Sequence, residues 1–474
     1  MDNIRDIIII GGGPGGYVAG IRAAQLGAKV FVVEKDKVGG TCLNRGCIPT
    51  KTLYRTAELL NNLKHIDDFG IKVDNYEVNV EKLQDRKSGI VNTLVSGIEK
   101  LMEGNGVELV RGEASFIDKN TIRVITKEGE LVLEGKHIII ASGSKSEIPP
   151  IEGINNPKVI TSDELLNFDY VPKTLAVIGG GVIGMEFASI FNALGSKVTV
   201  IVARDSILYD VDREITKRYT AMVKKMGIQI QTSTVVKSIS GEDEVVIKCD
   251  SKKGEVEIKA DMVLVAKGRI ANFEGLGLEK IGVDFDRKKI KVDDNYETSV
   301  KGVYAIGDVN GICLLAHAAS HQGVQVVEKI LLDKEIHNPS IPNCIFTFPE
   351  IATVGITEEE AKEKGIPYKK SKFLFGANGK ALALGEGEGF VKAICNSEDN
   401  TLLGIHIMGP HASDLIHEGV LAIDKNMKAY DIKDIVHSHP TLGEAFYEAV
   451  LALNGEAIHI INKWFTRGKK LWDI

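Results

Sequence analysis

The chain has 474 residues, of which 44% are hydrophobic and 26% charged, and its formal net charge is −7. This length exceeds what one hydrophobic core holds, so we expect several domains, in a composition ordinary for a soluble globular protein. The negative charge disfavours nucleic-acid binding, and no apolar run approaches the ~20 residues of a membrane span. The N-terminal "IIII" is too short for a signal peptide and runs into a glycine turn. We therefore expect a cytoplasmic protein without a membrane partner.

The first predicted elements are a strand, a glycine turn, a helix and a second strand, over residues 6–35. A short β-branched run precedes the turn, apolar residues at helical spacing follow it, and "KVFVVE" closes the unit. Gly11, Gly13 and Gly16 form the pattern G-x-G-x-x-G. In this pattern the glycines permit, in turn, a tight turn, close approach of a pyrophosphate and close packing of the helix. Free N–H groups at the helix start would bind the phosphates.

The same unit recurs at residues 174–203, where Gly179, Gly181 and Gly184 repeat the pattern. One such pattern is weak evidence, because glycine-rich turns between strands and helices are common. Two such patterns in one chain, each flanked by strands, are unlikely to occur by chance. The internal repeat therefore predicts two dinucleotide sites in one chain.

The remaining predicted elements, in chain order, are a helix over 80–104, strands within 106–141, strands within 228–265, a strand and Gly-Asp turn over 302–311, and a helix over 316–332. Residues 337–343 resemble a linker. The rest of the chain mixes strands and helices and contains no further nucleotide pattern.

The two repeats differ where a ribose partner is expected. Glu34 lies 18 positions after Gly16, where a carboxylate accepts hydrogen bonds from a ribose and repels a 2′-phosphate. The same count from Gly184 reaches Val202, and Arg204 follows two residues later. A guanidinium suits a 2′-phosphate, but it could equally point into solvent. The choice between NAD and NADP at the second site stays open.

The segment "GGTCLNRGCIPTK" (39–51) places Cys42 and Cys47 five residues apart. A zinc site is disfavoured, because no second Cys or His pair lies at ligand spacing nearby, and we expect no metal. In a regular helix these Cα atoms would be roughly 8–9 Å apart, whereas a disulfide needs less than about 7 Å. Gly46 and Pro49 favour a distorted backbone here. The pattern is typical of a redox pair.

The segment "HSHPTLGEAF" (437–446) contains His439 and, five residues later, Glu444. Thiolates attack disulfides, so an imidazole that accepts and returns a proton would suit a dithiol. A carboxylate partner would fix the histidine's tautomer and raise its basicity. A His–Glu pair at this spacing more often has only a structural role when it occurs alone. His437 is an alternative candidate for the histidine that accepts the proton.

Residues 39–51 closely resemble the redox-active segment of the FAD-dependent flavoprotein disulfide reductases, the pyridine nucleotide-disulfide oxidoreductases. That segment reads close to G-G-T-C-x-N-x-G-C-x-P-S-K, and Thr50 is the only departure. The likeness runs through almost the whole chain and includes both glycine patterns and segments 141–144, 268–283, 304–309, 347–355 and 437–446. Residues 315–323 are most similar to members that oxidise dihydrolipoamide.

The resemblance implies an α/β fold with two Rossmann-like dinucleotide-binding domains and a C-terminal α+β dimerisation domain. The implied boundaries are 1–150 for the first FAD-binding segment, 151–270 for the NAD(P)-binding domain, 271–338 for the second FAD segment and 339–474 for the interface domain.

The resemblance also assigns roles to individual residues. Cys42 would form a mixed disulfide with lipoamide, and Cys47 would lie against the flavin. His439 would be the acid/base and Glu444 its orienting partner, both supplied by the other subunit of a homodimer. The further implied residues are Lys51 near flavin N5, paired with Glu186, and the cofactor contacts Gly143, Gly268, Gly307, Asp308 and Ala316.

The implied activity is oxidation of protein-bound dihydrolipoamide, through a Cys42–Cys47 disulfide and FAD, with hydride transfer to NAD⁺ or NADP⁺. The expected partner is a lipoyl domain or lipoyl-carrier protein of a multienzyme complex. Two alternatives stay open. A related enzyme would reduce glutathione-like or other small disulfides, and a docking subunit would mainly serve the assembly of a 2-oxo acid dehydrogenase or glycine cleavage complex.

Overall fold

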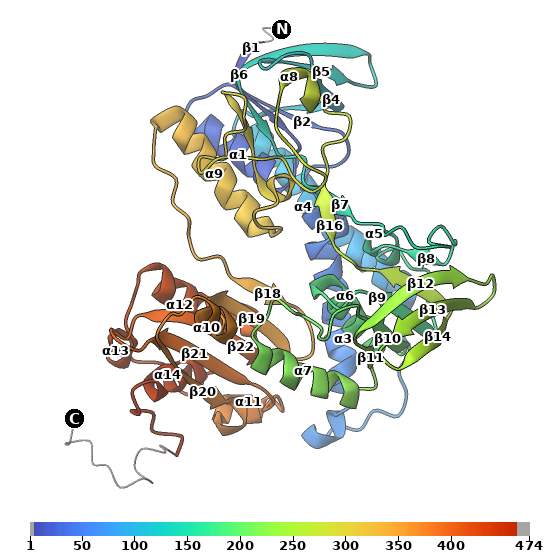
Figure 1. Ribbon diagram of the computed structural model, residues 1–474, viewed down its shortest axis with the longest axis vertical. Coiled ribbons are helices and arrows are strands. Elements are labelled where there is room, and N and C mark those ends of the chain that lie inside the picture. Colours follow the sequence, from blue (N-terminus) through green and yellow to red (C-terminus); the bar gives the residue numbers. More distant parts are fainter. Residues whose placement is uncertain (1–3, 462–474) are drawn as a thin grey trace. The chain divides into compact units, whose positions relative to one another are not determined.

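The computed structural model describes residues 4–461, which divide into two compact units (Figure 1). The first unit comprises the chain up to Pro172 together with Met262–Asn338. The second comprises Lys173–Asp261 and the chain from Pro339 onward. The four domains predicted from the sequence divide the chain more finely, and their boundaries stay a prediction.

The first unit is built around a mostly parallel sheet. Strand β1 (Ile4–Ile10) pairs in parallel with β2 (Val30–Glu34) on one side and with β6 (Glu130–Ile140) on the other. The strand order is β3-β2-β1-β6-β5-β4, and β17 (Val303–Ala305) also pairs with β6. The isoleucine run of β1 is buried throughout, since both faces of the sheet are covered.

Helices cover one face of this sheet and include α1 (Pro14–Gln25), α4 (Val80–Gly104) and α9 (Ala316–Leu332). The helices predicted over 80–104 and 316–332 are thus confirmed. The other strands of the first unit are β3 (Glu108–Arg111), β4 (Glu113–Phe116), β5 (Thr121–Ile125), β7 (Ser144–Ser146), β8 (Val159–Ile160), β15 (Met262–Val265) and β16 (Arg269–Ala271). Its other helices are α2 (Gly40–Arg45), α3 (Cys47–Leu63), η1 (Ile66–Phe69), α5 (Ser162–Leu165), α8 (Leu278–Ile281) and η2 (Gly307–Asn310).

The second unit begins with the repeated strand–turn–helix–strand, which confirms that prediction. Strands β9 (Thr174–Ile178), β10 (Lys197–Ile201) and β11 (Gln229–Gln231) pair in parallel. Helix α6 (Val182–Leu194) follows the glycine turn, and α7 (Arg213–Lys225) precedes β11. An antiparallel sheet follows, formed by β12 (Thr234–Ser240), β13 (Val245–Ser251) and β14 (Gly254–Ala260).

The C-terminal part of the second unit is a five-stranded antiparallel sheet with helices packed on it (Figure 1). Its strands, in spatial order, are β18 (Asn343–Ile345), β19 (Glu350–Gly355), β22 (Leu402–Gly409), β21 (Phe390–Asn396) and β20 (Tyr368–Leu374). Its helices are α10 (Glu358–Glu363), η3 (Phe375–Ala377), α11 (Gly379–Ala383), α12 (Ala412–Asp424), α13 (Ala429–Lys433) and α14 (Gly443–Ala452). The predicted fold class is confirmed. None of the helices within residues 4–461 is long and apolar enough to cross a membrane.

A buried ion cluster joins the two parts of the second unit. The Lys392 ammonium on β21 lies 2.8 Å from Asp212 Oδ2 and 2.9 Å from Glu358 Oε2. Lys392 is 1% exposed and Asp212, the N-cap of α7, is fully buried. Burial alone would raise the pKa of Asp212, but the hydrogen bond from Lys392 holds it below its ordinary value. Asp212 thus depends on the Lys392 ammonium, whereas Glu358 also pairs with Lys362 and Lys370.

Replacing Lys392 by methionine is expected to lower the free energy of unfolding by about 3–5 kcal/mol, because the change leaves the fully buried carboxylate of Asp212 uncompensated. Chemical denaturation at neutral pH measures this loss. The matched control is Lys370→Met, which removes a second, more exposed ammonium from Glu358 and should cost about 1 kcal/mol or less. Equal losses for the two variants would contradict the role given to burial.

Candidate active site

The two cysteines of the redox segment lie at a break between two helices. Helix α2 ends at Arg45, Gly46 adopts φ −145° and ψ −111°, and α3 begins at Cys47. A Cβ on Gly46 would lie 3.0 Å from Thr41 O, so the turn has little room for a side chain. The predicted non-helical backbone between the cysteines is therefore present.

Cys42 and Cys47 are not joined by a disulfide in this structure, and their side chains are hydrogen-bonded to one another. The hydrogen bond with Cys47, and then burial, raise the pKa of Cys42, while the positive charge of Lys51 acts in the opposite direction. Cys47 is the first residue of the 17-residue helix α3, whose N-terminus favours a thiolate. Pro49 lies in the first turn of α3, where its missing N–H costs no helical hydrogen bond. The segment is thus a pair of thiols, one of which lies where its thiolate form is stabilised electrostatically.

The first glycine turn has room for a phosphate at its second glycine. Gly11 has φ +108°, and a Cβ there would lie 2.4 Å from Ala141 O. A Cβ on Gly16 would lie 1.8 Å from Gly11 O, so the helix packs directly on the turn. A Cβ on Gly13, by contrast, would meet nothing closer than Gly40 Cα at 3.8 Å. The open space at Gly13 lies at the N-terminus of α1, where a pyrophosphate binds in such turns.

Glu34 lies beside this turn as predicted. Its Oε2 accepts a hydrogen bond from Gly12 N–H, and its Oε1 accepts one from Asp36 N–H, both at 2.8 Å. The carboxylate is 9% exposed and is therefore held in place for a ribose hydroxyl. Ser142 Oγ, in the adjoining segment, is buried and has no partner among the described residues. These groups fit an adenine dinucleotide.

Asp308 belongs to a network that the sequence did not predict. Gly307 has φ +73°, and its N–H donates to Gln322 Oε1 at 2.7 Å. Asp308 Oδ2 accepts from Ser144 Oγ at 2.5 Å. The Arg269 guanidinium in turn donates to Ser144 Oγ at 2.7 Å. Arg269 and Gln322 carry no spacing signal, because they approach Asp308 and Gly307 only through the tertiary fold.

The other predicted cofactor contacts also lie in the first unit. Gly143 has φ +71° and Gly268 has φ +153°, so both adopt backbone conformations that favour glycine. Ala316 is the first residue of α9. Their contact with a cofactor stays a prediction.

The second glycine turn reproduces the geometry of the first. Gly179 has φ +122°, and a Cβ on Gly184 would lie 2.0 Å from Gly179 O. A Cβ on Gly181 would meet nothing within 4 Å. The second turn therefore also has room for a pyrophosphate at its middle glycine, at the N-terminus of α6.

The end of β10 lacks a carboxylate and carries an oriented cation. Val202 is 5% exposed and packs towards the turn, since a Cβ on Gly180 would lie 2.7 Å from its Cγ2. The Arg204 guanidinium stacks on the Tyr209 ring, with its central carbon 3.3 Å from the ring centroid. The stacking restrains Arg204, which lies two residues after the position that corresponds by count to Glu34.

Glu186, on α6, is 4% exposed and its Oε1 accepts a hydrogen bond from Phe346 N–H at 3.0 Å. Lys51 belongs to the first unit and Glu186 to the second. The predicted pairing of Lys51 with Glu186 stays a prediction.

His439 and Glu444 are hydrogen-bonded to one another, and their acid/base role stays a prediction. His439 Nδ1 lies 2.8 Å from Glu444 Oε1, and Thr441 N–H donates to Glu444 Oε2 at 2.8 Å. Partial burial would raise the pKa of Glu444, but the hydrogen bonds from Thr441 and His439 lower it. The carboxylate thus stays ionised and orients the ring. The His439 side chain is 77% exposed, so its imidazole is open to a substrate.

His437, the rival histidine, has both ring nitrogens occupied. Its Nε2 lies 2.8 Å from Glu418 Oε1 and its Nδ1 lies 3.0 Å from Ile435 O. The ring packs against Tyr447 and the side chain is 11% exposed. This geometry gives His437 a structural role and favours His439 as the base.

A redox dithiol, two dinucleotide turns and a carboxylate-oriented histidine define a nucleotide-dependent disulfide oxidoreductase. A family profile described as pyridine nucleotide-disulphide oxidoreductase matches residues 5–323, and the dimerisation domain of the same family matches residues 341–450. The chain belongs to the pyridine nucleotide-disulphide oxidoreductase family.

Several curated relatives carry a more specific name. The chain is 41% identical over 468 residues to a dihydrolipoyl dehydrogenase of Bacillus subtilis, covering 96% of this chain and 99% of the relative. It is 42% identical to the mitochondrial dihydrolipoyl dehydrogenase of Pisum sativum, covering 96% and 93%. Among solved structures, the HOCl-induced flavoprotein disulfide reductase RclA of Escherichia coli superposes with a TM-score of 0.86 at 28% identity, covering 95% and 99%.

Proposed function

We propose that this protein is a dihydrolipoyl dehydrogenase, which oxidises protein-bound dihydrolipoamide to lipoamide with NAD⁺ or NADP⁺ as the final acceptor. The observation that carries the proposal is the contact between the Cys42 and Cys47 thiols at the break between α2 and α3. The near full-length similarity to dihydrolipoyl dehydrogenases supports the choice of substrate.

The oxidised enzyme carries a Cys42–Cys47 disulfide. A dihydrolipoamide thiolate attacks Cys42, which forms a mixed disulfide and releases Cys47 as a thiolate. The second lipoyl thiolate then attacks the lipoyl sulfur of the mixed disulfide, which releases lipoamide and the Cys42 thiolate. Two electrons have passed to the cysteine pair; His439 accepts the proton of the first lipoyl thiol, and the proton of the second passes to the departing Cys42 thiolate. Glu444 holds the ring in the required tautomer.

The first glycine turn, with Glu34 and Asp308, would hold FAD, and the second turn would hold the nicotinamide nucleotide. Bound FAD would supply the chemistry that links the two-electron dithiol to hydride transfer. The chain's part is to hold Cys47 at the start of α3, where the helix N-terminus favours the thiolate, and to place the positive charge of Lys51 where it favours the thiolate of Cys42.

A homodimer would complete the site. His439 is highly exposed on the part of the chain that matches the family's dimerisation domain. We propose that His439 and Glu444 serve the dithiol of the other subunit, and that the enzyme acts in the cytoplasm on a lipoyl domain of a multienzyme complex.

The test compares two reactions of the purified, FAD-loaded protein. Reduction of NAD⁺ or NADP⁺ by dihydrolipoamide should proceed readily, and NAD(P)H-dependent reduction of glutathione disulfide should be at background. Turnover with glutathione disulfide but not dihydrolipoamide would assign the protein to the other small-disulfide reductases. Binding to a multienzyme core without turnover of either substrate would identify a docking subunit.

The residues that follow β10 predict whether the enzyme prefers NAD⁺ or NADP⁺. Because Val202 carries no charge to repel a 2′-phosphate and Arg204 is held on Tyr209, NADP⁺ should be used with a kcat/KM at least comparable to that of NAD⁺. The Val202→Glu variant should shift the ratio of the two kcat/KM values towards NAD⁺ by about tenfold or more. Arg218→Ala, which removes an exposed arginine paired with Glu388, is the control and should leave the ratio unchanged. A strong preference of the unaltered enzyme for NAD⁺ would refute the prediction.

A further inference from the structure

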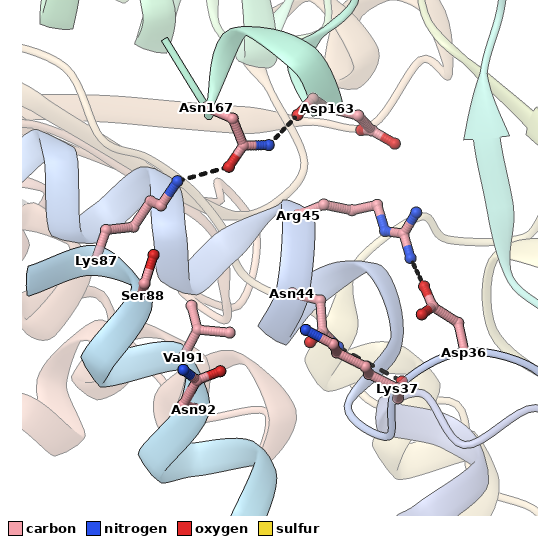
Figure 2. Close-up of a pocket in the computed structure, with 10 residues that line it drawn as sticks. All are labelled: Asp36, Lys37, Asn44, Arg45, Lys87, Ser88, Val91, Asn92, Asp163 and Asn167. Atoms are coloured by element: carbon pink, nitrogen blue, oxygen red, sulfur yellow. Dashed lines mark hydrogen bonds and ion pairs between the residues drawn. The ribbon is translucent and has the colours of Figure 1, made fainter. Parts of the chain in front are cut away.

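Two lysines are buried in the part of the chain that the structure describes, Lys87 and Lys392. Lys87 lies on α4 beside a polar cavity of the first unit, and its ammonium donates to the neutral Asn167 side chain at 2.8 Å (Figure 2). Burial lowers the pKa of Lys87. Burial alone would also lower the pKa of Lys392, but its hydrogen bond to Asp212 acts in the opposite direction and the pKa is raised. Lys392 is thus the buried lysine that a buried carboxylate holds.

That carboxylate ends the loop that connects β10 with α7 and carries Arg204 and Tyr209. Asp212 is the N-cap of α7, and its Oδ1 accepts a hydrogen bond from Glu214 N–H at 3.0 Å. Both of its oxygens also accept from the Lys392 ammonium, at 3.0 and 2.8 Å. Lys392 lies on β21, in the C-terminal sheet. The end of the loop is therefore held by a residue outside the nucleotide-binding repeat.

Backbone hydrogen bonds hold the start of the same loop. Val202 N–H donates to Gln231 O at 2.8 Å, and Val202 O accepts from Thr234 N–H at 2.9 Å. Arg204 O accepts from Ser233 N–H at 2.7 Å. The backbone of Arg204 is thus attached to the segment that joins β11 with β12.

The middle of the loop is attached to the second glycine turn. Leu208 N–H donates to Gly180 O at 2.8 Å. Leu208 has φ +47°, a left-handed conformation that leucine rarely adopts, and the residue is 3% exposed. Strained backbone of this kind persists only where the surrounding structure holds it. Asp212 lies four residues further on, so its ion pair with Lys392 is one of the contacts that hold this part of the loop.

A buried ion pair adds little net stability, because the cost of removing two charges from water offsets much of their attraction. It does fix the geometry of the segments that carry it, since separating the charges leaves each one uncompensated. A residue of the C-terminal sheet can therefore determine where the loop after β10 lies.

We propose that the Asp212–Lys392 pair is a positioning element of the nicotinamide-nucleotide site, which holds the loop 203–211 and thereby keeps Arg204 in place for the nucleotide. Asp212 and Lys392 act through the loop and not by contact with the nucleotide. The positioning role rests on the proposed use of the second glycine turn for NAD⁺ or NADP⁺. It adds to that function a link from the C-terminal sheet to nucleotide affinity.

The test compares the full-length, FAD-loaded protein with the double variant Asp212→Ser/Lys392→Met. Serine keeps an N-cap oxygen for α7 on a shorter side chain, and methionine keeps the apolar stem of lysine without its charge. The double variant leaves Glu358 paired with Lys362 and Lys370, so no carboxylate of the cluster loses all of its cations. Its Kd for NADP⁺ should rise by about tenfold, and its Kd for NAD⁺ by less. The rate at which dihydrolipoamide reduces the enzyme without nucleotide should be unchanged.

A double-mutant cycle with Arg204→Ala separates positioning from a general loss of structure. In the unaltered protein Arg204→Ala should weaken NADP⁺ binding by about tenfold. In the Asp212→Ser/Lys392→Met background it should have little further effect, because the guanidinium is no longer held in place. Arg218→Ala is the matched control, since it breaks an exposed pair between α7 and Glu388 and should change neither Kd.

Flavin content and circular dichroism establish that each variant is folded. If the double variant does not fold, Asp212→Ser alone decides the matter, because Lys392 then keeps Glu214 and Glu358 as partners.

Unchanged NADP⁺ binding in the double variant, or an effect of Arg204→Ala that is the same in both backgrounds, would overturn the positioning role and leave the proposed function intact. Failure of the unaltered protein to bind either nucleotide, or no effect of Arg204→Ala on its NADP⁺ binding, would refute the proposed nucleotide site and the positioning role together.

Discussion

Replacing Cys47 by serine is expected to lower the rate of dihydrolipoamide-dependent NAD⁺ or NADP⁺ reduction by at least about a thousandfold. Losses of this size are typical when a residue that forms a covalent catalytic intermediate is removed. A serine hydroxyl cannot form the disulfide with Cys42 that stores the two electrons. The flavin content should be unchanged, since the glycine turns and Glu34 are intact. Steady-state assay of the variant, together with its flavin absorbance, measures both quantities.

The control for this change is Cys249→Ala, which removes a buried thiol from β13 and should leave turnover close to that of the unaltered enzyme. A Cys47→Ser variant that retained turnover with dihydrolipoamide would rule out the dithiol relay. If Cys249→Ala lost activity as fully, the assay would be reporting misfolding rather than chemistry.

Replacing His439 by glutamine is expected to lower kcat with dihydrolipoamide by about 10²- to 10⁴-fold, because the attacking thiol loses its general base. Glutamine retains a hydrogen-bonding group of similar size but cannot accept the proton. Steady-state measurement of kcat with dihydrolipoamide tests this expectation.

His437→Gln is the matched comparison, since it changes a histidine two residues away whose ring nitrogens already face Glu418 and Ile435. It should affect stability more than kcat. Glu444→Gln should lower kcat less than His439→Gln, because the imidazole remains but loses its orienting carboxylate. A loss of kcat in His437→Gln as large as that in His439→Gln would contradict the assignment.

Local sequence predicted the parts of the site that depend on neighbouring residues. The glycine turns follow from three positions within six residues, and their conformations at Gly11 and Gly179 are the left-handed ones that a tight turn requires. The break at Gly46 follows from the spacing of the cysteines and from the geometric limit on a disulfide. In each case the physical constraint acts over less than two helical turns.

Contacts between distant segments could not be predicted in the same way. Asp212, Glu358 and Lys392 meet in the core of the second unit, yet nothing in their sequence spacing relates them. Arg269 and Ser144 approach Asp308 only because β7 and β16 pair. The choice between His437 and His439 also needed the structure, since both have the same local composition and only their contacts differ.

The central claim is that Cys42 and Cys47 form a disulfide which dihydrolipoamide reduces. The most direct test is alkylation of the anaerobic, FAD-loaded protein before and after one equivalent of dihydrolipoamide, followed by mass spectrometry of the peptide that spans residues 42–47. The account predicts that neither thiol is alkylated in the oxidised protein and that both are alkylated after reduction, with the other four cysteines unchanged. Free Cys42 and Cys47 in the fully oxidised protein, or reduction that changed a different cysteine, would contradict it.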